Sequence, residues 1–68
     1  MNIGEGVKTL RTKSQMSQEE LANTVNVSQS MIAQIERGSK TLTIPLGLQI
    51  SDALGTTLAE LLNIAQNY

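Results

Sequence analysis

The side chains of this chain that could do chemistry favour binding over catalysis. The 68 residues include no histidine and no cysteine, which excludes the common nucleophile–base pairs, disulfides and the usual zinc sites. Glu19 and Glu20 are neighbours on a predicted helix and point to different faces, so they do not form a carboxylate pair. A chain this short is also too small for a substantial cleft. We therefore expect no enzyme activity and no cofactor.

Hydrogen-bonding side chains are concentrated between positions 17 and 40. A glutamine amide can make a bidentate pair with N6 and N7 of adenine, and a serine hydroxyl can donate or accept. Cations such as Arg37 and Lys40 suit phosphate groups. Taken singly, each of these residues fits the solvated face of a helix or loop equally well. The elements that carry them must decide between the two interpretations.

Residues 18–35, QEELANTVNVSQSMIAQI, contain two short helical patterns separated by a short break. The apolar positions that give each pattern one buried face are Leu21, Val25, Val27, Ile32 and Ile35. Ala22 is small where the two helices approach each other, and Asn26 tolerates the positive φ that such a turn often needs. This arrangement is typical of a helix-turn-helix, whose second helix, here 28–37, can enter the DNA major groove.

The remaining patterns predict helices over residues 3–12, 43–54 and 57–65. Capping boxes at Ser17/Glu20 and Thr57/Glu60 mark two of the helix starts. The prediction is an all-α protein of five short helices forming a single domain, residues 1–68. A core of this size supplies roughly 3–5 kcal/mol, so the fold needs tight packing or a partner subunit.

The formal net charge of −1 is unusual for a DNA-binding domain, for which a basic surface is expected. All five cationic residues lie in residues 1–41 with four acidic ones, a balance of +1, whereas residues 42–68 hold only Asp52 and Glu60. The half that contains the helix-turn-helix is therefore the more basic one. No apolar run reaches membrane-spanning length and the first residues lack a signal-peptide pattern, so we expect a soluble protein without a membrane partner.

The order of these elements resembles the Cro/CI-type family of helix-turn-helix regulators, also called the XRE family. The resemblance rests on LRTKSQMSQEELANTVNVSQSMIAQIERG and ALGTTLAELL and covers roughly residues 3–63. It implies a lambda-repressor-like DNA-binding domain that acts on double-stranded DNA as a transcriptional regulator. It further implies a repressor that binds a palindromic operator as a homodimer, without a metal, cofactor or small-molecule ligand, in the cytoplasm of a bacterium or from a phage genome.

The resemblance also assigns roles to individual residues. Gln29 would be the main contact to a base edge, with Ser30, Ala33 and Gln34 as further base contacts. The residues placed at DNA phosphates are Ser17, Gln18, Ser28, Arg37, Ser39 and Lys40. Ser17 and Ser28 are helix caps first of all, and Lys13 is a weaker phosphate candidate.

Two further sets would be structural. Arg11 and Glu36 match an Arg–Glu ion pair that ties the first helix to the third in this family. Family dimers meet around the last helix and the loop before it, which leaves Thr56, Thr57, Ala59 and Leu61 open for an interface. Leu58 and Leu62 are expected to lie mostly in the core. Leu46 and Leu48 flank Gly47, and at least one of them is expected to be exposed and available to a second subunit.

A protein-interaction module, such as an antitoxin or an antirepressor-partner domain, is the alternative. The acidic pI and the apolar region near Leu46 and Leu48 would suit it, and fold alone does not decide. A protein-binding helix usually presents apolar anchors, whereas helix 28–37 carries Gln and Ser on its predicted outer face. The sequence therefore favours DNA as the partner.

Overall fold

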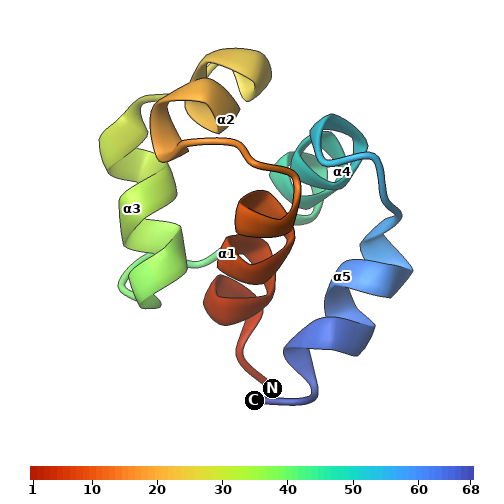
Figure 1. Ribbon diagram of the computed structural model, residues 1–68. Coiled ribbons are helices and arrows are strands. Elements are labelled where there is room, and N and C mark those ends of the chain that lie inside the picture. The colour runs from red at the N-terminus through yellow and green to blue at the C-terminus, as the bar shows by residue number, and fades with distance from the viewer.

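The computed structural model describes residues 1–68 and has five α-helices and no strand (Figure 1). The helices are α1 (Ile3–Lys13), α2 (Gln18–Val25), α3 (Gln29–Arg37), α4 (Ile44–Ala53) and α5 (Leu58–Ala65). The predicted all-α class and the number of helices are confirmed. None of these helices has both the length and the apolar character needed to cross a membrane.

Each helix begins at a side chain that accepts a hydrogen bond from a backbone amide three residues later. The caps are Asn2, Ser17, Ser28, Thr43 and Thr57. At Ser17 the capping box is complete, because the Glu20 carboxylate also accepts from the Ser17 amide at 2.9 Å. At Thr57 only the forward half forms, so the capping box predicted there is incomplete. Local sequence thus sets where the chain becomes helical.

Left-handed residues end α2 and α3. Asn26 follows α2 with φ of 62° and ψ of 44°, and Gly38 follows α3 with φ of 80°. Asn26 is the residue expected to take a positive φ at the helix-turn-helix turn, and Gly38 needs no side-chain space in that conformation. The tight Asn26 turn brings α3 directly onto α2.

The core is aliphatic and is built around α1, which lies between α3 and α5 in Figure 1. α2 packs on both α3 and α4, and α4 also packs on α5. The side chains that are completely buried come from all five helices: Val7, Leu21, Ile32, Ile35, Ile50 and Leu61. Because every helix contributes to one core, the position of α3 depends on the whole domain.

Two glycines let α1 approach its neighbours closely. A Cβ atom at Gly4 would lie 2.5 Å from the carbonyl oxygen of Ile35, so α1 touches the backbone of α3 there. A Cβ atom at Gly6 would lie 3.2 Å from Leu61 Cδ1 of α5. The Gly4 contact places the α1 surface directly beside the end of α3, which becomes important for the functional surface.

Candidate nucleic-acid interface

The predicted base-contacting residues share the outer side of α3. Its inner side is buried through Ile32, Ile35 and Glu36. The residues on the outer side, all partly or fully exposed, are Gln29, Ser30, Ala33, Gln34 and Arg37. With about 3.6 residues per turn they lie within one arc of the helix. This face offers hydrogen-bond donors and acceptors and carries no large apolar anchor.

The first turn of α3 presents the most accessible of these groups. Gln29 and Ser30 are both exposed, and neither side chain is held by a hydrogen bond within the protein. The preceding Ser28 is used differently, because its hydroxyl accepts from the Met31 amide at 3.1 Å and caps the helix. Ser28 therefore defines the start of α3, while Gln29 and Ser30 are free to pair with an external partner.

The start of α2 is a second polar surface next to α3. The first amides of an α-helix have no partner within the helix and carry the positive end of its dipole, which favours a phosphate. Gln18 lies at this position and is half-buried. Its Nε2 atom donates to Oε1 of Glu36 at 3.0 Å. The sequence did not indicate this bond, which turns the amide nitrogen of Gln18 inward and leaves one N–H for other partners.

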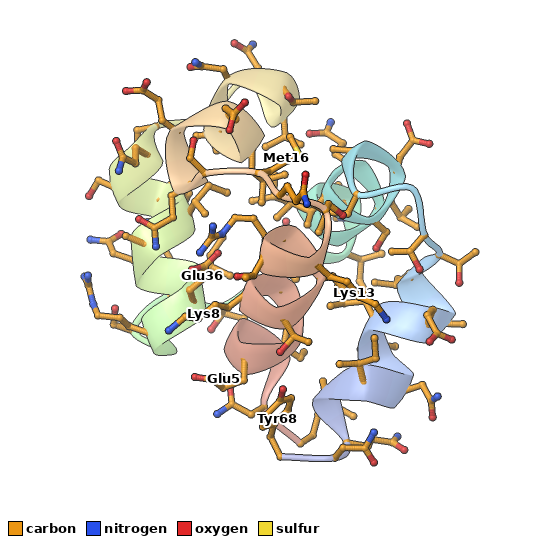
Figure 2. All side chains as sticks on the ribbon, in the orientation of Figure 1. Glu5, Lys8, Lys13, Met16, Glu36 and Tyr68 are labelled. Carbon is orange, nitrogen blue, oxygen red and sulfur yellow. The ribbon has the colours of Figure 1, made fainter.

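A buried carboxylate joins α1, α2 and α3. Glu36 accepts from Arg11 Nε at 2.6 Å and from Arg11 Nη2 at 3.1 Å, besides the bond from Gln18. Arg11 Nη1 donates to the Met16 carbonyl at 2.7 Å, in the connection between α1 and α2. Figure 2 shows Glu36 between α1 and α3. The Arg11–Glu36 ion pair predicted from the family resemblance is confirmed, and it holds α3 at a set angle to α1 and α2.

The loop after α3 supplies exposed cations. Arg37 and Lys40 are exposed, and neither is part of an ion pair, since the structure contains one salt bridge, between Arg11 and Glu36. Ser39 is also exposed, and its hydroxyl donates to the Gln34 carbonyl at 3.3 Å. The structure therefore brings the predicted base and phosphate residues to adjoining surfaces on α2, α3 and the loop.

Comparison with protein families identifies this arrangement. Residues 7–61 match the model of a helix-turn-helix family, HTH_3. That range contains all of α2, the Asn26 turn, α3 and α4. The chain belongs to this helix-turn-helix family. Comparison with curated proteins gave no significant match.

Solved structures with the same fold include two regulators. The clp gene regulator ClgR from Corynebacterium glutamicum is 27% identical with a TM-score of 0.94, and the match covers 97% of this chain and 70% of that one. The restriction-modification controller protein C.AhdI from Aeromonas hydrophila is 30% identical with a TM-score of 0.85, covering 88% and 91%. Iron(II) HppE in complex with substrate is 26% identical with a TM-score of 0.81, covering 88% of this chain but 35% of that one.

The fold of this helix-turn-helix domain is lambda-repressor-like, of the Cro/CI or XRE type. Together, the family and the two similar regulators make the protein a helix-turn-helix DNA-binding transcriptional regulator. The HppE match shows that the same fold also occurs as part of a larger chain of a different kind, so the roles of individual residues must be argued from their own geometry.

The prediction that Leu61 is available for a subunit interface is wrong for this helix-turn-helix domain. Its side chain is 0% exposed and lies in the core, because α5 packs against the bare backbone of Gly6 through Leu61 and Ala65. Leu62, which was expected in the core, is instead half-exposed and outside the core cluster. Leu58 is partly buried and packs on the core as expected. The buried face of α5 therefore runs through Leu58, Leu61 and Ala65, and not through Leu58 and Leu62.

The other interface candidates are accessible. Thr57 and Ala59 are exposed and Thr56 is half-buried. Two large aliphatic side chains on α4 are also exposed, Ile44 at 66% and Leu48 at 53%. Ile44 and Leu48 are four residues apart and therefore lie on the same side of α4. The expectation that one leucine near Gly47 is exposed is met by Leu48, and Ile44 is an addition that the sequence analysis missed.

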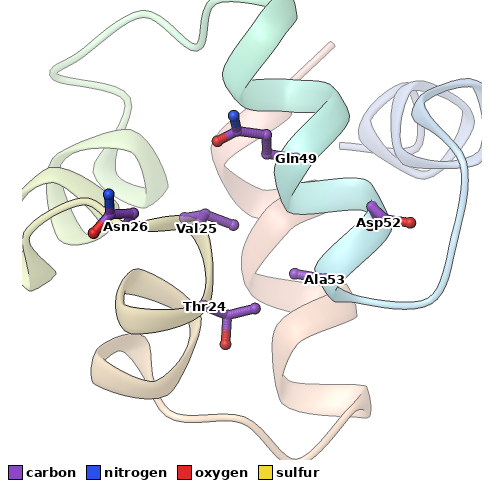
Figure 3. Close-up of a pocket in the computed structure, with 6 residues that line it drawn as sticks. All are labelled: Thr24, Val25, Asn26, Gln49, Asp52 and Ala53. Carbon is purple, nitrogen blue, oxygen red and sulfur yellow. The ribbon is translucent and has the colours of Figure 1, made fainter.

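A hollow of about 270 Å³ lies between the end of α2 and α4 (Figure 3). It is lined by Thr24, Val25, Asn26, Gln49, Asp52 and Ala53. None of these residues belongs to the predicted DNA contacts, and the hollow has an acidic side chain but no cation. It is therefore separate from the polar surface on α2, α3 and the loop.

Proposed function

We propose that this domain binds a specific double-stranded DNA operator with α3 in the major groove and Gln29 as the main base contact. The observation that carries the proposal is the exposed side-chain amide of Gln29, which has no hydrogen-bond partner within the protein. It lies in the first turn of α3, a helix whose opposite side is buried in the core. Glutamine pairs best with adenine N6 and N7, while Ser30 and Gln34 add weaker contacts and Ala33 suits a thymine methyl group.

Phosphate contacts would come from the two surfaces beside α3. The start of α2 offers the free backbone amide of Gln18 together with the side chains of Ser17 and Gln18. The loop offers Arg37, Ser39 and Lys40. Each phosphate neutralised by a cation should steepen the log–log dependence of affinity on salt by roughly 0.9. These contacts position the domain and do not distinguish sequences.

We also propose that two copies bind a palindromic operator as a homodimer and that this represses transcription by covering promoter DNA. Half-sites would lie about 34–36 Å apart, one turn of DNA. The exposed Ile44 and Leu48 on α4, together with Thr56, Thr57 and Ala59, form a surface suited to a two-fold interface. Large aliphatic groups exposed by more than half gain most from such burial.

The experiment is selection of binding sites from a random DNA pool at two salt concentrations, with wild type, Gln29→Ala and Gln49→Ala. Gln49 is an exposed glutamine on α4 that lines the separate hollow, so it is the matched control. Wild type and Gln49→Ala should enrich the same palindrome. Gln29→Ala should lose preference at one position per half-site. Absence of any enriched sequence at low salt would contradict the proposal.

The dimer is tested separately with Leu48→Ser. Sedimentation equilibrium of the wild type on a full palindrome should give two protein chains per DNA. The variant should need a higher protein concentration to occupy both half-sites, with unchanged circular dichroism, because Leu48 is outside the core. One wild-type chain per palindrome at saturation would refute the dimer.

A further inference from the structure

A cleft of about 460 Å³ lies where α1, α2 and α3 meet. Its walls include Gln18 from the start of α2 together with Ala33 and Arg37 from the outer side of α3. These three residues belong to the proposed DNA-binding surface. The cleft is therefore continuous with that surface and extends it onto α1, where the only DNA contact predicted from the sequence was the weaker phosphate candidate Lys13.

The α1 wall of the cleft contributes Lys8. Gly4 touches the backbone of α3, and Lys8 is one helical turn later on the same side of α1. Figure 2 shows Lys8 on the α3 side of α1, near Glu36, whereas Lys13 points to the side nearer α5. Lys8 is exposed, so its ammonium group can reach a ligand at the mouth of the cleft.

The charges in the cleft leave it locally positive in a protein whose net charge is −1. Glu36 is neutralised by Arg11, with which it forms the one salt bridge of the structure. Lys8 and Arg37 have no carboxylate within 4.0 Å. Glu5 also lines the cleft and has no cationic group within 4.0 Å. Two free cations therefore face one free carboxylate, a balance of +1 beside the outer side of α3.

We propose that this cleft binds a DNA backbone phosphate through Lys8 and Arg37, beside the phosphate at the start of α2. The inference rests on the proposed function and adds α1 to the DNA-binding surface. Lys8 provides a flexible point charge, so it contributes affinity and not sequence preference. Glu5 lies in the same cleft and opposes the phosphate, so the two α1 side chains act in opposite directions.

The test compares wild type, Lys8→Gln, Lys13→Gln and Glu5→Gln on one duplex carrying the selected operator. Affinity is measured by fluorescence anisotropy over a series of salt concentrations from about 50 to about 200 mM. Lys8→Gln should lower the magnitude of the log–log slope by roughly 0.9 for each bound chain, or about 1.8 for two chains on the palindrome, because each chain loses one counter-ion-releasing contact. Lys13 was a weaker phosphate candidate in the sequence, but its side chain lies on the side of α1 nearer α5 and does not line the cleft. We therefore assign it no phosphate contact. Lys13→Gln removes the same charge as Lys8→Gln and should leave the slope unchanged. Glu5→Gln should tighten binding.

Each outcome decides something different. An equal loss of slope in Lys8→Gln and Lys13→Gln would overturn the inference, because net charge alone would then explain it. Suppose that wild type binds the duplex and that Gln29→Ala shows a weaker preference for the operator sequence. An unchanged slope in Lys8→Gln then overturns this inference and leaves the proposed function standing. Lys8→Arg keeps the charge and should restore the wild-type slope. If wild type binds no duplex, both proposals fail together.

Discussion

Replacing Arg11 by methionine should strongly destabilise the domain, because it leaves a buried carboxylate without its counter-ion. The Arg11 and Glu36 side chains are only 12% and 4% exposed. In Arg11→Met, Glu36 keeps the single hydrogen bond from Gln18, and the Met16 carbonyl loses the Nη1 donor. Methionine fills much of the volume of the arginine stem, so the change tests charge and hydrogen bonding more than packing.

The expected loss is comparable to the whole stability of the protein. Removing one partner of a buried ion pair costs about 3–5 kcal/mol, and a core of this size supplies about 3–5 kcal/mol in total. Arg11→Met should therefore be largely unfolded in buffer. Arg11→Met/Glu36→Leu removes both charges and should recover the part of the loss that comes from the unpaired carboxylate. About 1–3 kcal/mol should remain, because the Met16 carbonyl is left without a donor.

Urea denaturation followed by far-ultraviolet circular dichroism gives the free energy of unfolding. All variants are measured at one concentration of trimethylamine N-oxide, which favours the folded state of those that are unfolded in buffer. Lys13→Met, on the exposed side of α1, is the control and should change stability by less than about 0.5 kcal/mol. If Arg11→Met lowers the free energy of unfolding by less than about 1 kcal/mol, which is the range of an exposed ion pair, the reasoning is refuted.

Three further predictions concern packing and turns. Gly4→Ala should lower Tm and cost about 1–3 kcal/mol of stability, because its Cβ would lie 2.5 Å from the Ile35 carbonyl oxygen. Helix propensity alone predicts a raised Tm, and that result would show that α1 and α3 are further apart. Asn26→Ala should cost about 1 kcal/mol in chemical denaturation because φ is positive there, whereas Asn26→Gly should be nearly neutral; equal losses would argue against the left-handed turn. Leu61→Ala should cost about 2–5 kcal/mol of stability and Leu62→Ala much less. The reverse order would show that Leu62, and not Leu61, lies in the core.

The elements were predictable because their signals act over short distances. A cap such as Ser17 or Thr43 accepts from an amide three residues away, and Asn26 takes the left-handed conformation expected at its turn. The outer side of α3 followed from helical periodicity once Ile32 and Ile35 were assigned to the core. The DNA contacts assigned to that side stay predictions.

The Arg11–Glu36 pair has a different origin. The two residues are 25 positions apart, and no local pattern relates them, so their contact came from the family resemblance. The bond from Gln18 to Glu36 was missed altogether, because it depends on the angle at which α2 meets α3. A half-buried glutamine at a helix start gives no sequence signal for such a bond.

The sequence by itself therefore determined the five helices, their starting caps and the polar outer side of α3, all of which depend on residues within one or two turns. Only the tertiary structure decided which of the adjacent Leu61 and Leu62 is buried, since both fit an apolar stripe on α5 and the packing on Gly6 selects Leu61. It also decided that Lys8 stands across a cleft from Arg37. Two cations 29 positions apart in the chain share a site because Gly4 lets α1 lie against the end of α3, and that contact is a property of backbone packing.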